Sequence, residues 1–588
     1  MKKSISIIAC VLVIAMLFVS CGGKKAQTAA PAPQTTTTTA APAKAETPAP
    51  AKVETPAPAK AETPAPAPAK AETPAPAPAP APAASDKVVF RIANGAEPES
   101  LDPSQIQGVP EHRIYEALFE GLIAFDPETA DGIPGVAESW TVSDDGLVYT
   151  FKLRDAKWSD GTPITADDVV YSWLRELAPE TASPYAWFPC MFIAGANEYN
   201  SGAAGAEAVQ IRAIDDKTFE MTLIGPLPYV IGALGHYSFA IVPKHAIEKY
   251  GKDWILPQNF VGNGPYVLKE WTPQDKIVCA KNYEYWDAEN VKLDEVVFYA
   301  SDDDNTNYNM YINGEIDWMT SAPSDKLDAI KMRSDYQVAP QLSSYYYTIQ
   351  NERAPFDDAN VRKALSLAVD RQQLVDEVTK GGQLPAWGIV PNMAGYEALE
   401  APFGFDDMDS AIEEAQNLLA EAGYPNGVGF PKFSLLYNTN DDHKKIAEFV
   451  QRQWKENLGI ECELENQEWG TYLSNRNSGN FDVARAGWVG DYQDPNTFLD
   501  MFITGAGMNG GRYSNEEYDV LINEAARMEA GQDRFEVLKT AEDIFINEDQ
   551  GILPFYYYVS QNLVDTDKWG GWHSNTMDYH PTKDIYLK

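Results

Sequence analysis

Residues 481–495 of this chain read FDVARAGWVGDYQDP. The stretch begins as a short apolar run of the kind that forms a buried strand, yet it carries Arg485 and Asp491 with Trp488 between them. A buried charge is costly unless it is paired. A cation, an anion and an aromatic wall on adjoining backbone therefore predict a site for a zwitterionic ligand. The alternative is an internal salt bridge between Arg485 and Asp491 at the end of the strand.

Strand and helix signals alternate on both sides of this segment. Short strands are expected at residues 88–92 and 148–153, the second because its apolar residues alternate with period two. A helix is expected over Val361–Val369, where apolar residues recur at helical spacing. The mixture indicates α/β or α+β lobes with mixed sheets.

Two helix starts are predicted from capping residues. Thr165 and Asp168 form a capping box that opens a helix through Trp173. Ser514 and Glu517 predict a second capped helix that runs to Ala526.

Residues 1–20 have the pattern of a secretory signal peptide. Lys2 and Lys3 precede an apolar run from Ile5 to Val19, shorter than the roughly 20 residues of a transmembrane helix. Cys21 follows, and this junction resembles a bacterial lipobox, which implies a lipidated first residue at Cys21 and two acyl chains as an anchor. The chain is then expected to be lipid-anchored to the cell envelope, in the periplasm or at the cell surface. The alternative is an ordinary cleaved signal with an incidental cysteine.

Residues 21–85 are expected to be a disordered tether. They repeat Ala-Glu-Thr-Pro-Ala-Pro with interspersed Ala-Lys, and proline fixes φ and removes backbone donors. Such a segment spaces a folded domain away from a membrane. A second reading, as a ligand for aromatic grooves, stays open.

Residues 86–588 form the part that can fold, and their length predicts two or three lobes. The net charge of −40 argues against nucleic acid or anionic lipid as a partner. Cys190, Cys279 and Cys462 show no metal-ligand spacing, so we expect no metal site and at most one disulfide. The acidic run at residues 302–307 lacks the glycine and glutamate of a calcium loop, and we expect a solvated acidic turn there.

Five short sequence motifs, far apart along the chain, together indicate a protein family. They are Pro134–Trp140, Ala156–Gly161, Gly262–Tyr266, Ala354–Asp358 and Val361–Leu365. Together they resemble the solute-binding proteins of peptide-importing ABC transporters, the bacterial extracellular solute-binding proteins of family 5. The run through Arg485, Trp488 and Asp491 is similar to the oligopeptide-binding branch.

The resemblance implies an α/β, three-lobed fold of the periplasmic-binding-protein kind, with mixed sheets and a hinged ligand cleft. Lobe I would comprise about 86–120, 245–343 and 559–588, lobe II about 121–244, and lobe III about 344–558. The ligand would be a short peptide, lying extended and paired through its backbone with protein strands. Closure would be a hinge motion, and the partner would be an ABC transporter permease.

The resemblance also implies roles for charged residues. Asp491 would pair with the α-ammonium of the peptide, whereas a helix or turn cap is its alternative. Arg485, Arg476 and His443 would meet the terminal carboxylate of peptides of different lengths, and a solvated helix start is the alternative for His443. Tyr185 would contact the peptide, unless it is a core aromatic with a satisfied hydroxyl.

The remaining predicted ligand-binding residues supply walls and backbone groups. Trp469 and Trp488 would be pocket walls, or simply core of lobe III. Gly487, Val489 and Val109 would offer backbone groups. Gln107 stands where related binders often have an acidic residue, which implies an altered side-chain or length preference.

Two other classes of function compete with a peptide binder. An enzyme is improbable because no GxSxG, HExxH, CxxC or Walker A sequence is present. A surface-displayed adhesion or sensory lipoprotein stays open, as does another family-5 solute such as a nickel complex or a murein peptide. We expect a monomer without cofactors or catalytic residues.

Overall fold

The computed structural model describes residues 87–402 and 407–588. The predicted signal peptide, Cys21 and the whole predicted tether lie outside the described residues. None of the described helices combines the length and the apolar character needed to cross a membrane.

An 11-stranded mixed sheet is the largest element of the described chain. Its path runs through β15 (Cys462–Gln467), β14 (Phe433–Asn438), β16 (Val483–Val489), β12 (Tyr336–Ile349), β17 (Ile552–Val564), β11 (Trp318–Met319), β1 (Val89–Ala93), β10 (Glu295–Tyr299), β9 (Lys276–Lys281) and β8 (Tyr266–Thr272), with β13 (Leu384–Pro385) paired to β17.

A separate four-stranded antiparallel sheet is built from β4 (Ala137–Val142), β5 (Val148–Leu153), β7 (Thr218–Thr222) and β6 (Ile211–Asp215). Two short hairpin-like pairs, β2 (Ile123–Phe125) with β3 (Gly132–Pro134) and β18 (Trp569–Gly570) with β19 (Tyr586–Leu587), complete the strands.

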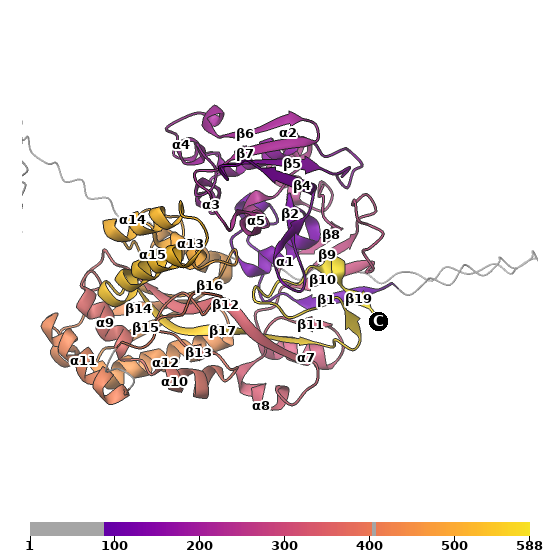
Figure 1. Cartoon of the computed structure of the whole chain (residues 1–588). Helices are drawn as coiled ribbons and strands as arrows, with labels where there is room; N and C mark the ends of the chain where they lie inside the picture. The colour runs from indigo at the N-terminus through magenta and orange to yellow at the C-terminus, as the bar shows by residue number, and fades with distance from the viewer. Residues whose placement is uncertain (1–86, 403–406) are drawn as a thin grey trace, which may run out of the picture. The chain divides into compact units, whose positions relative to one another are not determined.

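The longer helices flank these sheets (Figure 1). They are α1 (Val109–Leu118), α2 (Ala166–Leu177), α7 (Asp304–Ile312), α9 (Ala359–Leu367), α11 (Met408–Glu421), α12 (Asp441–Leu458), α13 (Trp469–Ser478), α14 (Glu516–Ala525) and α15 (Gln532–Asp543). The expected α/β class with mixed sheets is thereby confirmed, while the expected lobe limits stay a prediction.

Strands β12 and β17 run side by side through the middle of the large sheet (Figure 1). The first half of β12 pairs with the second half of β17, next to β11, and its second half pairs with the first half of β17 and with β16. The register shifts between Pro340 and Ser344, and such an irregularity bends and twists a strand pair. The two strands therefore connect the β1–β8–β9–β10 part of the sheet with the β14–β15–β16 part through a distorted junction.

Helix α12 shows why the local sequence folds as it does. Asn440 caps it by accepting hydrogen bonds from the backbone of Asp442 and His443, and Gly459 ends it in the left-handed region at φ 70°. Its buried residues recur at helical spacing, and the largest, Trp454, donates from Nε1 to the carbonyl of Leu365. This packing holds α12 with its first turn at the large sheet.

The capping box of Thr165 and Asp168 is confirmed at the start of α2. The predicted cap of α14 is wrong by one residue, because Asn515, not Ser514, accepts from the backbone of Glu517 and Tyr518. Asparagine is as favourable as serine at the N-cap position of a helix. Cys190, Cys279 and Cys462 are free thiols.

Candidate ligand-binding site

All eleven predicted ligand-binding residues line one cavity of about 380 Å³. They are Val109, Gln107, Tyr185, His443, Trp469, Arg476, Arg485, Gly487, Trp488, Val489 and Asp491. Tertiary structure thus brings together side chains from the loop before α1, from the segment after α2, and from α12, α13 and β16. No grouping of His, Cys, Asp and Glu within the described ranges could hold a metal ion.

Strand β16 forms one wall of the cavity. Arg485, Gly487 and Val489 are half-buried and alternate with buried neighbours, as period-two strand geometry requires. One edge of β16 pairs with β12 along its whole length, from Val483 to Val489. The other edge pairs with β14 only at Val483 and Ala484. Within the described residues, no strand pairs with this edge of β16 from Gly487 to Val489, and these three residues line the cavity.

The Arg485 guanidinium has no carboxylate partner among the described residues. Its Nη2 donates to Tyr558 Oη at 2.8 Å and its Nη1 to Asn438 Oδ1 at 3.4 Å, and it lies 5.0 Å from the centre of the Tyr345 ring. Nε is buried without a hydrogen-bond partner. Gly487 makes room for this arrangement, because a Cβ there would lie 2.9 Å from Arg485 Nη2. A buried cation left with uncharged partners is poised to meet an anion.

The Asp491 carboxylate is also held only by weak contacts. Tyr185 Oη lies 3.5 Å from both carboxylate oxygens, and His236 Nε2 lies 3.4 Å from Oδ1. Burial, followed by the nearby Asp500, raises the pKa of the Asp491 carboxyl well above its usual range. Arg485 and Asp491 thus have separate partners, which excludes the salt bridge between them, and within residues 87–402 and 407–588 Arg485 contacts no carboxylate and Asp491 no Lys or Arg.

The rim of the cavity joins the loop before α1 to α13. Trp469 Nε1 donates to Glu111 Oε1 at 3.1 Å, Gln107 Nε2 donates to Glu99 Oε2 at 2.8 Å, and Gln107 Oε1 accepts from Asn477 Nδ2. Glu111 Oε2 is buried without a partner. Gln107 therefore bridges two segments far apart in sequence in place of an acidic residue.

Glu111 should make stability depend on pH. Burial raises the pKa of its carboxyl from 4.5 to about 7, so ionisation opposes folding: the penalty is absent below the unfolded pKa, grows as pH rises from about 4.5 to 7, and stays constant above that. Glu111→Gln should then be more stable than the parent by about 2–4 kcal/mol at pH 8, with the difference vanishing near pH 4. Urea unfolding across this pH range measures it, with the exposed Glu463→Gln as control. A difference that is the same at every pH would contradict the assignment.

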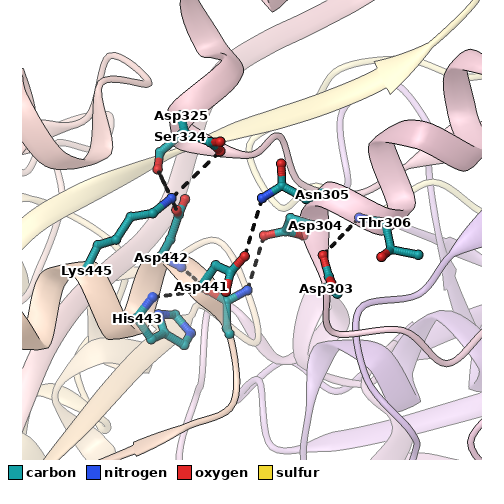
Figure 2. A network of polar contacts seen from close by, with 11 residues as sticks. Asp303, Asp304, Asn305, Thr306, Ser324, Asp325, Asp441, Asp442, His443 and Lys445 are labelled. Atoms are coloured by element: carbon teal, nitrogen blue, oxygen red, sulfur yellow. Dashed lines mark hydrogen bonds and ion pairs between the residues drawn. The ribbon is translucent and has the colours of Figure 1, made fainter.

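The first turn of α12 borders another part of the cavity, and Figure 2 shows its polar network. Asn440 Nδ2 donates to Asp304 Oδ2 at 3.2 Å, and Lys445 Nζ lies 3.0 Å from Asp442 Oδ1 and 2.8 Å from Ser324 Oγ. These contacts connect α12 with α7 and the segment that follows β11. The helix start of His443 is thus tied into tertiary structure and is not a solvated surface.

The surroundings of His443 disfavour a charged imidazole. Burial, and then the neighbouring Arg485 cation, lower the pKa of its imidazole well below the usual value, and Nδ1 is buried without a partner. A ligand carboxylate entering here would offset both effects. Its role toward a terminal carboxylate stays a prediction.

The expectation of a solvated acidic turn at residues 302–307 is wrong in part: Asp302 and Asp303 are exposed, but the run opens a helix and Asp304 is buried. Asp303 caps α7 by accepting from the Thr306 backbone, and Asp304 is 5% exposed and bonds to Ser321 Oγ at 2.5 Å. Burial and the nearby Asp442 raise the pKa of Asp304 to about 6. Sequence alone predicts solvent exposure for residues 302–307, because it does not show that α12 packs against them.

Sequence reasoning missed several cavity residues. Among them are His236, Tyr237, Asn438, Tyr558 and Tyr579. The only available signal for His236 was a lone histidine beside Gly235 and Tyr237, which has no metal-ligand spacing. Its importance depends on contacts with residues more than 250 positions away, which no local pattern contains.

Comparison with known proteins agrees with this geometry. Residues 132–510 match the family model described as bacterial extracellular solute-binding proteins, family 5 Middle. The chain is 41% identical over 510 residues to the periplasmic oligopeptide-binding protein OppA of Salmonella typhimurium, covering 86% of this chain and 92% of that protein. It superposes on the crystal structure of Haemophilus influenzae OppA in complex with RPPGFSPFR with a TM-score of 0.81 at 34% identity, covering 86% and 99% of the two chains.

The open form of a related protein superposes less well on this structure. The unliganded open form of the murein tripeptide-binding protein MppA gives a TM-score of 0.59 at 36% identity, covering 86% of this chain and 98% of that chain. Since the identities are nearly equal, the difference lies in the arrangement of the parts. The present structure therefore superposes better on the peptide complex than on the unliganded open form.

Proposed function

Because this chain belongs to the bacterial extracellular solute-binding proteins of family 5, we propose that it captures short peptides outside the cytoplasm and delivers them to an ABC-type peptide importer. The observation that carries the proposal is the cavity wall itself. A free backbone edge on β16 lies between an unpaired cation, Arg485, and an unpaired anion, Asp491. Main-chain hydrogen bonds, a terminal ammonium and a terminal carboxylate are what every short peptide offers.

The chemistry of each part supports this function. An added strand at the β16 edge would bind through backbone groups and so tolerate many side chains. Asp491 would hold the α-ammonium with a charge-assisted hydrogen bond. Arg485, with His443 and Arg476 for other peptide lengths, would receive the carboxylate. Tyr185, Trp469 and Trp488 would form side-chain walls, and the Trp488 Nε1–H is buried without a partner.

The family is one of solute-binding proteins, and we infer that this member binds its ligand without transforming it. We also propose a monomer that is held at the membrane by lipid on Cys21, with residues 21–85 as spacer. The motif at Cys21 supports this anchor. The permease is the partner that the binding function requires.

Isothermal titration calorimetry with tri- to pentapeptides, each with free or acetylated amino terminus, tests the function. Free peptides should bind tightly and acetylated ones should bind much more weakly. Identifying the ligand that copurifies with the protein by mass spectrometry would give the natural pool. If no peptide bound and none copurified, the proposal would be wrong and a murein peptide or nickel complex would replace it as the candidate.

Replacing Arg485 by methionine should separate binding from stability. Affinity for peptides with a free carboxylate should fall roughly 10- to 100-fold, from the loss of a hydrogen bond to a charged group, and most strongly for one peptide length. The thermal stability of the ligand-free protein should stay equal or rise, since Arg485 has no carboxylate partner among the described residues.

Amidated peptides provide the matched comparison. They should bind the parent weakly and the Arg485→Met variant no worse. Arg353→Met is the control variant, because Arg353 pairs with Asp482 at 2.8 Å and does not line the cavity. Equal losses for amidated and free peptides would contradict the role of Arg485.

A further inference from the structure

His236 approaches Asp491 from a different part of the chain. It is the cap residue of the short helical turn Tyr237–Phe239, which packs on α2, whereas Asp491 follows β16. The His236 side chain is 2% exposed and that of Asp491 is 8% exposed, with 3.4 Å between Nε2 and Oδ1. The two groups therefore meet inside the protein, out of reach of bulk water.

The cap decides which ring nitrogen carries the proton. His236 Nδ1 accepts from the Ser238 backbone N–H at 3.3 Å. An amide N–H can only donate, so this contact assigns Nδ1 as an acceptor and the hydrogen of the neutral ring to Nε2. The Ser238 hydroxyl, whose Oγ lies 3.0 Å from Nδ1, can donate to the same nitrogen. Nε2–H then points its hydrogen toward Asp491, and the direction of this contact follows from the local backbone.

The ring also has surroundings that keep it neutral. Tyr185, Phe188 and Tyr237 pack around it, with ring centroids 4.8, 4.9 and 3.8 Å away. The other histidine nearby, His112, stacks at 6.5 Å, and the apolar packing disfavours a charged imidazole. A neutral donor can orient a carboxylate without cancelling its charge.

We infer that His236 is a positioning residue for peptide recognition: its neutral Nε2–H, set by the Ser238 backbone, orients the Asp491 carboxylate for the ligand ammonium and leaves the negative charge of that carboxylate available. Tyr185 Oη, at 3.5 Å from both oxygens, supplies the second donor from the same side. The ammonium site is thus assembled from both the β16 segment and the segment around Tyr185 and His236. This inference rests on the proposed function.

Two substitutions distinguish the capping role of His236 from its contact with Asp491. His236→Asn keeps a side-chain acceptor for the Ser238 N–H, since asparagine is a preferred cap, but it is too short to reach Asp491. His236→Gln places an amide N–H at about the reach of Nε2. Calorimetry of each full-length variant with a peptide whose amino terminus is free or acetylated provides the readout.

His236→Asn should weaken binding of the free peptide roughly 10- to 100-fold and leave the acetylated peptide within about twofold. His236→Gln should recover most of the loss. Phe188→Leu, which removes packing from the same ring and no donor, is the matched control and should not separate the two peptides. Thermal unfolding of each variant checks that it folds.

Equal losses for free and acetylated peptides in His236→Asn, or no rescue by His236→Gln, would overturn the positioning role while the proposed function stood. An unaltered preference for the free peptide in His236→Asn would overturn it too. If the parent protein itself bound no peptide, the proposed function would be the part that failed. The outcomes are therefore distinguishable.

Discussion

Replacing Asp491 by asparagine is expected to weaken the binding of peptides with a free amino terminus by roughly 100- to 3,000-fold. Breaking a buried ion pair by removing one partner costs about 3–5 kcal/mol, and each 1.4 kcal/mol is a factor of about ten in affinity. The carboxylate is buried, and its contacts with Tyr185 and His236 are long. Calorimetry with a free and an N-acetylated peptide measures the effect, because the acetylated peptide should lose little.

The same substitution should abolish a proton release. Burial and Asp500 raise the pKa of the Asp491 carboxyl in the ligand-free protein, while the ligand ammonium favours the charged form. Binding below the raised pKa therefore expels a proton, and the parent's affinity should rise with pH through that pKa. Calorimetry in buffers of different ionisation enthalpy reports this proton, which the Asp491→Asn variant should not release.

Asp482→Asn is the control for both measurements. Asp482 lies at the start of the same segment, accepts from Arg353 and the Ser434 backbone, and does not line the cavity. Its affinity should stay within about twofold of the parent. If Asp491→Asn bound free peptides as tightly as Asp482→Asn does, Asp491 would not be the ammonium site.

Replacing Arg534 by methionine is expected to cost about 3–5 kcal/mol of folding free energy. Its side chain is fully buried and donates two hydrogen bonds to Asp494, at 2.8 and 2.9 Å. Nε donates to the Ala525 carbonyl at 2.9 Å, and the guanidinium lies 5.0 Å from the Tyr229 ring centre. Methionine would leave the Asp494 carboxylate buried with no cation. Urea and thermal unfolding measure the loss.

Substitution of Asp494, the partner of Arg534, tests whether the orphaned charge causes the loss of stability. Asp494→Asn added to Arg534→Met removes the orphaned charge and should recover part of the stability, which a double-mutant cycle quantifies. Lys455→Met is the control, because its pair with Glu461 is more than half exposed on both sides and such surface pairs contribute little to stability. A loss for Arg534→Met as small as for Lys455→Met would show that the buried pair does not stabilise the fold.

Local sequence was enough to predict elements whose signal lies within a few residues. The strand at Val148–Leu153 and the capping box of Thr165 and Asp168 are found as expected, because alternation and capping act over one or two turns. The cap at Asn515 was missed by one residue, since several polar residues there satisfy the same rule. The family and its fold were predicted from several short motifs taken together. No single motif would have been enough.

The sequence predicts which charged residues the site contains, but not whether each of these charges is paired. The segment 481–495 by itself determined that a strand would carry Arg485 and that Asp491 would lie close behind it, since strand period is local. Only tertiary structure decided that these charges do not pair with each other. It surrounds Arg485 with Tyr558 and Asn438, brings Tyr185 and His236 to Asp491, and ends the pairing of β16 with β14 at Ala484. Burial and distant partners set whether a charge is satisfied, and both arise only when segments hundreds of residues apart are packed together.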